Sequence, residues 1–126
     1  MSQLLLHLIG DYLLQSGWMA NNKSKSHFAA FVHALVYSLP FLLLRPSLAA
    51  WLVIFGTHFI IDRYCLAKHV AKIKNYLAPR KQWPKNGDLS HFGYCKNIPD
   101  FLAMWLLIIT DNTLHLLINF LSLKFL

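Results

Sequence analysis

Histidine and aspartate recur four residues apart within strongly apolar stretches of this chain. Three such pairs occur: His7 with Asp11, His58 with Asp62, and Asp111 with His115. They use three of the five acidic residues, all of which are aspartates. Four residues are about one turn of an α-helix, so both members of a pair point to the same side of their helix. An ionisable group at apolar depth is costly unless it is paired or coordinated, so such pairs mark candidate functional sites.

Histidine and aspartate side chains can bind a metal ion or transfer protons. Neutral imidazole and carboxylate are ligands for zinc, manganese and iron, and a carboxylate also orients a histidine through its second ring nitrogen. A metal held by three or four side chains with one open position activates water. Without a metal, the same side chains would relay protons, since histidine titrates near neutral pH. An isolated pair is better explained as a structural hydrogen bond between helices, but three pairs favour a shared site.

The composition indicates a membrane protein. Of the 126 residues, 56% are apolar and 13% are charged, and the mean hydropathy is +0.43. Soluble domains have roughly 25% charged residues. The alternative is a compact helical soluble protein. The length suits a single domain over residues 1–126.

Four apolar segments are predicted to be helical and to span or enter a bilayer. They cover residues 3–20, 27–44, 48–77 and 101–126, and a basic loop covers residues 78–100. A bilayer core needs about 20 helical residues. The first segment is short and polar, so its insertion depends on its partners. The third segment continues beyond its apolar part. The expected fold is therefore all-α: an integral membrane four-helix bundle with a cytosolic extension of the third helix and a basic loop.

Local signals support the second and third segments. Ser26 and Ser47 are each placed to cap the helix that follows. Pro40 is expected to kink the second helix near its end.

The basic residues predict the orientation. Eight of the twelve Lys and Arg residues lie within residues 63–96, on the same predicted side as Lys23 and Lys25, whereas the other side has Arg45 and Lys124. The positive-inside rule then places both termini outside the cytosol, and the expected location is the bacterial cytoplasmic membrane. The expected partners are the bilayer and anionic lipid headgroups at the basic loop, although that loop is also explained as a solvated surface. Nucleic acid is not an expected partner.

The helix rise of about 1.5 Å per residue places the polar side chains of the four segments at overlapping depths. The expected metal ligands are His7, Asp11, His33, His58, Asp62, Asp111 and His115. The expected cofactor is a divalent metal, with zinc favoured over manganese, iron or magnesium. Seven residues exceed the coordination of one zinc ion, so some must orient others, or two metals lie about 3.5–4 Å apart. His33 alone is also explained as a hydrogen-bond partner of Tyr37.

Several motifs, in this order along the chain, resemble the DUF3307 family of small bacterial and phage membrane proteins. The residues that carry the resemblance are His7–Gln15, Trp18–Ala20, His33, Thr57–Asp62 and Asp111–Leu116. The family's last motif often has Gln after its aspartate, where this chain has Asn112, and residues 79–99 match no family pattern. The resemblance implies a multi-pass helical membrane domain and brings no established activity. The His/Asp layout is also similar, more distantly, to membrane-bound metal-dependent hydrolases.

The leading functional hypothesis is a metal-dependent hydrolase that acts on a lipid or phosphoester, with Asp11 or Asp62 as the general base. One alternative is a protein that transports or senses protons or metal ions, which would need a homo-oligomer because four helices are few for a transporter. Another is a structural or interaction module, for example a phage or bacterial membrane factor that acts on a host protein through the basic loop.

Overall fold

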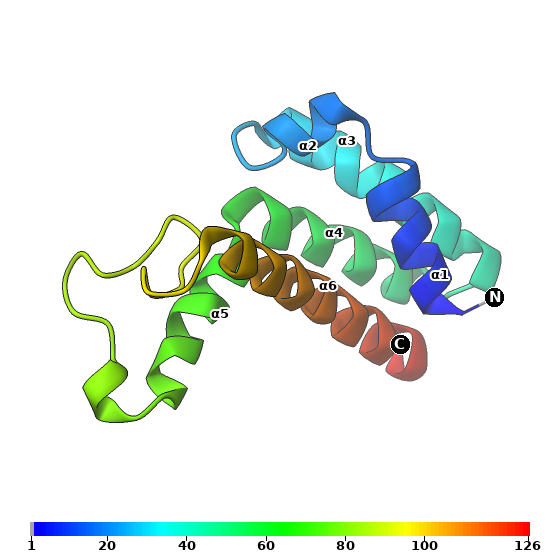
Figure 1. Cartoon of the computed structure of the whole chain (residues 1–126). Coiled ribbons are helices and arrows are strands. Elements are labelled where there is room, and N and C mark those ends of the chain that lie inside the picture. The colour runs from blue at the N-terminus through cyan, green and yellow to red at the C-terminus, as the bar shows by residue number, and fades with distance from the viewer. Residues whose placement is uncertain (1) are drawn as a thin grey trace. The chain divides into compact units, whose positions relative to one another are not determined.

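The computed structural model describes residues 2–126, and this part of the chain is helical and contains no β-strand (Figure 1). This confirms the all-α fold class. Its elements are α1 (Gln3–Leu8), η1 (Ile9–Leu13), α2 (Gly17–Asn22), α3 (His27–Ser38), η2 (Leu39–Leu44), α4 (Leu48–Tyr64), α5 (Leu66–Lys74), η3 (Asn75–Leu77), η4 (Arg80–Gln82) and α6 (Asp100–Phe125).

The chain divides into two compact units. The first contains the residues up to Tyr64 together with Leu114–Leu126, and the second contains Cys65–Thr113. The long helix α6 contributes its first half to the second unit and its last turns to the first. The single domain and the four-helix bundle expected from the sequence stay predictions.

The single helix expected over residues 3–20 is wrong. Helix α1 passes into a π-helical turn, η1, in which the N–H of Leu14 donates to the carbonyl of Ile9 at 2.9 Å. The chain then leaves the helical path, and α2 begins after Ser16, whose hydroxyl accepts a hydrogen bond from the N–H of Met19 at 3.3 Å. The polar residues of this segment therefore lie on two short helices joined by a bend.

The second and third segments are helical as predicted, with local changes. Ser26 and Ser47 cap α3 and α4, each accepting a hydrogen bond from a backbone N–H three residues later. At Pro40, which has no N–H to donate, α3 gives way to the 3₁₀-helix η2. The third segment is helical up to Leu77 but is interrupted at Cys65, whose backbone is left-handed with φ of 50°.

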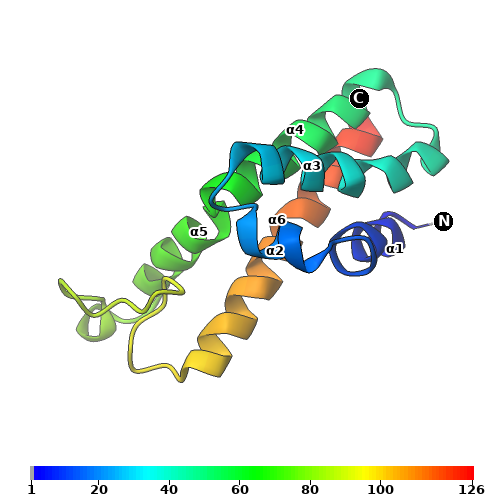
Figure 2. The ribbon, with the colours of Figure 1, turned by 90° about the horizontal axis from the view of Figure 1, so that it is seen from above.

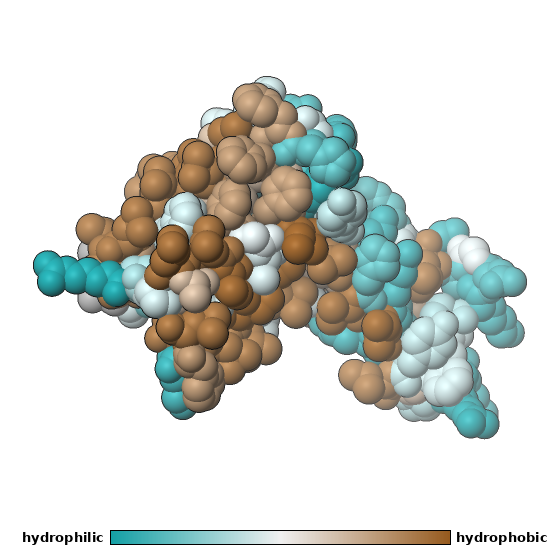
Figure 3. Space-filling model, turned by 180° about the vertical axis from the view of Figure 1, so that it is seen from behind, coloured by the Kyte–Doolittle hydropathy of each residue, from teal (hydrophilic) through white to brown (hydrophobic). Residues whose placement is uncertain are grey.

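Within residues 2–126, two helices are long and apolar enough to cross a membrane: His27–Leu44 and Asp100–Phe125. The broken pair Leu48–Tyr64 and Leu66–Leu77 makes a third if it counts as one span. The first unit also exposes large apolar side chains, including Leu13, Leu43 and Leu48, and its surface is mostly hydrophobic in Figure 3. Such a surface is typical of a protein that contacts lipid.

The core of the first unit lies between α1, α3, η2 and α4 (Figures 1 and 2). It consists of Leu6, Tyr37, Phe41 and Ile54, with Leu44 and Leu123 packed against them. Helices α3 and α4 lie side by side along most of their length. The polar cluster described below adjoins this core through Tyr37, so a rigid apolar base positions it.

In the second unit, α5 packs against the first half of α6 and against the loop that joins them. Ala71, Tyr94 and Ala103 form its small core. Lys74 fixes this packing, because its ammonium donates to the hydroxyl of Tyr94 at 2.9 Å and to that of Thr110 at 2.8 Å.

Candidate metal centre

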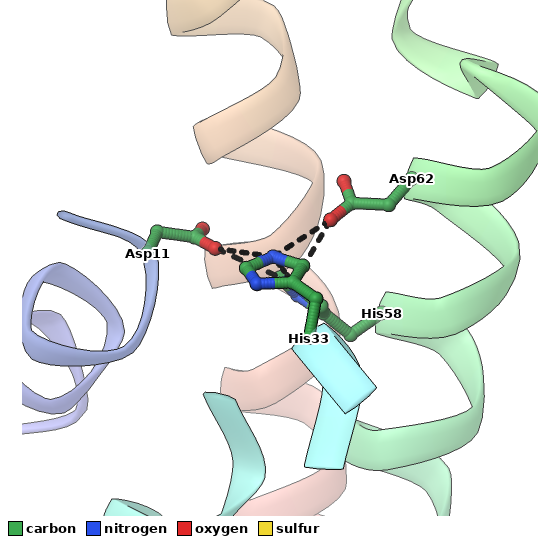
Figure 4. Close-up of side chains that lie close together, drawn as sticks. All are labelled: Asp11, His33, His58 and Asp62. Atoms are coloured by element: carbon green, nitrogen blue, oxygen red, sulfur yellow. Dashed lines mark hydrogen bonds and ion pairs between the residues drawn. The ribbon is translucent and has the colours of Figure 1, made fainter. Parts of the chain in front are cut away.

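Four ionisable side chains converge inside the first unit: Asp11, His33, His58 and Asp62 (Figure 4). Asp11 comes from η1, His33 from α3, and His58 and Asp62 from successive turns of α4. All four are buried, and each offers one ligand atom such that these atoms lie within 4.8 Å of one another. We call these four residues the inner cluster.

The facing atoms of the inner cluster are close together. The Nε2 atoms of His33 and His58 lie 2.9 Å apart. Oδ1 of Asp11 lies 3.3 Å from each of these nitrogens. Oδ2 of Asp62 lies 2.9 Å from Nε2 of His33 and 3.2 Å from Nε2 of His58. Two nitrogens and two oxygens thus surround one small space.

These separations match a tetrahedral metal site. Zinc binds nitrogen and oxygen at about 2.0–2.2 Å, which places neighbouring tetrahedral ligands about 3.3–3.6 Å apart. The separations in the inner cluster, from 2.9 to 3.3 Å, are only slightly shorter. In addition, Oδ1 of Asp11 is buried and accepts no hydrogen bond, although both imidazoles are near it. These five separations are therefore short enough for direct contacts between the four side chains and are also close to those of zinc ligands.

Two further histidines, His7 and His115, lie beside the outer oxygens of the two carboxylates. Each carboxylate directs one oxygen inward and the other toward a histidine. Oδ2 of Asp11 lies 3.5 Å from Nδ1 of His7, and Oδ1 of Asp62 lies 3.5 Å from Nε2 of His115. His115 also lies behind His58, with their Nδ1 atoms 3.1 Å apart. With Nδ1 of His58 as the donor of this contact, its Nε2 is unprotonated, which is the form that a metal requires.

Tyr37 connects this outer layer to the apolar core. Its ring stacks on the imidazole of His58 with centroids 3.5 Å apart. Its hydroxyl lies 2.9 Å from Nδ1 of His7 and accepts a hydrogen bond from the Asn119 amide at 2.7 Å. Tyr37, His7 and Asn119 are 2% exposed or less. From the sequence, Tyr37 was expected only as a partner of His33, and no sequence signal marks Asn119.

The π-helical turn and a glycine bring Asp11 into place. A π-turn inserts one extra residue into a helix and is often found at functional sites. Here it lies at η1, which contains both Gly10 and Asp11. A Cβ on Gly10 would lie 2.6 Å from Cδ2 of Tyr37 and 3.0 Å from its backbone oxygen, so only glycine allows η1 to approach α3 this closely.

Lys23 was not anticipated at the site. It follows α2, yet its ammonium lies 3.0 Å from Oδ2 of Asp62 and 3.4 Å from Nε2 of His33. Its side chain is 22% exposed, whereas the carboxylate of Asp62 is 3% exposed. A lysine in a polar connector carries no periodic signal, so only the folded structure shows its position.

Six of the seven predicted metal ligands thus gather in the first unit. Four form the inner cluster, and His7 and His115 lie behind it. The seventh, Asp111, lies one turn before His115 on α6, in the part of that helix that belongs to the second unit. The expectation that it joins the site stays a prediction.

Residues 1–87 match a protein family described as "Protein of unknown function (DUF3307)". The chain belongs to this family. The match covers 87 of the 126 residues and includes all four residues of the inner cluster of this DUF3307 protein. No curated protein and no solved structure gave a match to the chain. The family assignment made from the motifs is therefore confirmed, and the proposal of an activity rests on the geometry of the site.

Proposed function

We propose that this DUF3307 protein binds one divalent metal ion within the membrane and uses it to hydrolyse a lipid or another phosphoester. The observation that supports this proposal is the convergence of two imidazole nitrogens and two carboxylate oxygens on one buried space. Burying two carboxylates is costly unless cations compensate them, and a metal ion provides that compensation where the donor atoms already lie at suitable separations.

The donor set favours zinc. Two imidazoles and two carboxylates suit a borderline-soft ion, and manganese or iron is the next choice, whereas magnesium prefers oxygen ligands alone. When bound, such an ion supplies a Lewis acid that activates water and polarises the ester. His33 and His58 would hold it through Nε2 and Asp62 through Oδ2, which leaves the fourth position for water and Oδ1 of Asp11 available to accept a proton.

The surroundings of the two aspartates favour Asp11 as the general base. Asp62 is already engaged by a cation, since its Oδ2 lies 3.0 Å from the ammonium of Lys23. Asp11 has an inward oxygen with no hydrogen bond, and His7 lies beside its other oxygen. We assign proton acceptance to Asp11, orientation of that carboxylate to His7, and a fixed, charge-balancing role to Asp62.

The charges at the two ends of the first unit support the membrane orientation that we propose. Arg63, at the end of α4, donates to the carbonyl of Ser24 at 2.8 Å, so the connector that contains Lys23 and Lys25 lies at the same end as Arg63. Arg45 belongs to the opposite turn, between η2 and α4. We propose that the end with Lys23, Lys25 and Arg63 faces the cytosol, that the protein resides in the bacterial cytoplasmic membrane, and that anionic headgroups adjoin its basic loop.

The deep burial of the site favours one alternative function. The side chains of His33, His58 and Asp62 are 3% exposed or less and that of Asp11 is 8% exposed. A buried site suits a protein that stores, senses or passes on a metal ion or proton without turnover. This second candidate shares the metal site and differs from the first only in whether a product forms.

Incubation of the metal-loaded protein with a panel of phospholipids and soluble phosphoesters tests the proposal. We expect product release that depends on zinc or manganese, stops with a chelator, and falls at least about 100-fold in Asp11→Asn, as is typical when a general base is lost. The control is Asp88→Asn, which changes an exposed aspartate of the basic loop. Stoichiometric metal with no product from any substrate would reject the hydrolase and favour the second candidate.

A further inference from the structure

Lys23 is a cation located between the inner cluster and the protein surface. Its ammonium lies within 3.4 Å of Asp62 and His33, and its side chain is partly exposed while theirs are buried. A molecule that reaches the inner cluster along this side chain therefore meets Lys23 first.

The positive charge of Lys23 adds to the charges of the two carboxylates and of the metal ion. The only acidic residues within the part of the chain that forms this unit are Asp11 and Asp62, because the other three aspartates belong to residues 65–113. One divalent ion balances these two carboxylates, so the ion, Asp11, Asp62 and Lys23 together sum to about one positive unit. Without the ion, the same three side chains sum to about one negative unit. Binding of the ion therefore changes the summed charge of these groups by two units, in the direction that favours an anion.

Two neighbouring cations, Lys25 and Arg63, add to the positive charge around Lys23. Lys25 is exposed two residues further along the connector. The Arg63 guanidinium is held at this connector by the carbonyl of Ser24, with its second nitrogen 3.5 Å from Nε2 of His27. No acidic side chain of the first unit lies at this end apart from the inner cluster itself. A lysine ammonium beside a metal is a common arrangement for binding phosphate oxygens.

We propose that Lys23 is the substrate-binding residue that selects a phosphate group, so that the substrate of this site is a phosphoester and not a neutral carboxylic ester. The inference rests on the proposed metal site. In the metal-loaded protein the ammonium contacts a phosphate oxygen while it remains close to Asp62. The phosphate belongs either to a lipid headgroup or to a soluble phosphate compound, and both present the same oxyanion.

Calorimetric titration of the zinc-loaded protein in neutral detergent tests this proposal. The two probes are inorganic phosphate and a short-chain phosphatidic acid below its micelle concentration, each added with and without zinc. We expect wild-type protein to bind phosphate only when zinc is present. Phosphatidic acid binding at least about tenfold tighter than inorganic phosphate would identify a lipid headgroup as the source, and equal binding would identify a soluble compound.

The variant Lys23→Met retains the aliphatic stem and removes the charge, and Lys25→Met is the matched control on the same connector. We expect Lys23→Met to weaken binding of both probes at least about tenfold without lowering zinc content, and Lys25→Met to change it less than about threefold. Unchanged phosphate binding in Lys23→Met, or an equal loss in both variants, would overturn the inference. Zinc binding by the wild type without phosphate binding rejects this inference alone, whereas failure to bind zinc rejects the proposed function together with it.

Discussion

The substitution His115→Ala tests whether the outer histidines position the inner ones. His115 contacts Nδ1 of His58 at 3.1 Å and Oδ1 of Asp62 at 3.5 Å. Neither of these two atoms faces the centre of the inner cluster, because His58 directs Nε2 and Asp62 directs Oδ2 toward it. Removal of His115 therefore leaves the proposed ligand atoms in the protein but releases the hydrogen bond that fixes the tautomer of His58.

The expected magnitude follows from these contacts. A buried polar group that loses its partner costs about 1–3 kcal/mol. If the metal-bound state bears that cost, zinc affinity falls by about 5- to 150-fold, since 1.4 kcal/mol corresponds to a factor of ten. Losses of about 10- to 100-fold are typical when the residue that orients a metal ligand is removed. His58→Ala, which removes a proposed ligand, is expected to reduce zinc binding far more.

Competition with a chromophoric zinc chelator measures these affinities in detergent. His69→Ala is the control, because it removes an exposed imidazole from α5, where Nδ1 of His69 lies 3.4 Å from the carbonyl oxygen of Cys65. We expect the order wild type, His69→Ala, His115→Ala, His58→Ala from tightest to weakest. Equal losses in His115→Ala and His58→Ala would make His115 a ligand itself, and no loss in His115→Ala would refute the positioning argument.

Two further substitutions test the packing that supports the site. Tyr37→Phe keeps the ring stacked on His58 but leaves the Asn119 amide without its acceptor, so the free energy of unfolding should fall by about 1–3 kcal/mol in a denaturant titration; an unchanged value would contradict a structural role for this hydroxyl. Gly10→Ala forces a methyl group against Tyr37 and should lower the free energy of unfolding by about 1–3 kcal/mol. Gly56→Ala, which meets open space on α4, should cause no loss, and equal effects of the two glycine variants would show that η1 does not approach α3 as closely as described.

Much of the local structure was predictable because its signals are local. The capping serines, the proline that ends α3 and the apolar length of α6 each act within a few residues. The break in the first segment was not predictable, because helical periodicity does not distinguish a continuous helix from one with a π-turn.

The candidate site was predictable as a set of residues but not as an arrangement. The spacing of His7 and Asp11 placed both on one side of a helix. The free-energy cost of burying ionisable groups in an apolar segment marked them as candidate site residues. It did not show that Asp11 faces His33 and His58 while His7 lies behind it, because this division depends on how helices pack. The contact of Lys23 with Asp62 likewise joins residues 39 positions apart and has no sequence signal.

Zinc K-edge X-ray absorption of the zinc-loaded protein measures the central claim most directly. Our account predicts one zinc ion per chain with four nitrogen or oxygen ligands at about 2.0–2.2 Å, two of them showing the multiple scattering of imidazole. A spectrum with sulfur ligands from Cys65 or Cys95, a spectrum without imidazole, or zinc far below one ion per chain would contradict it.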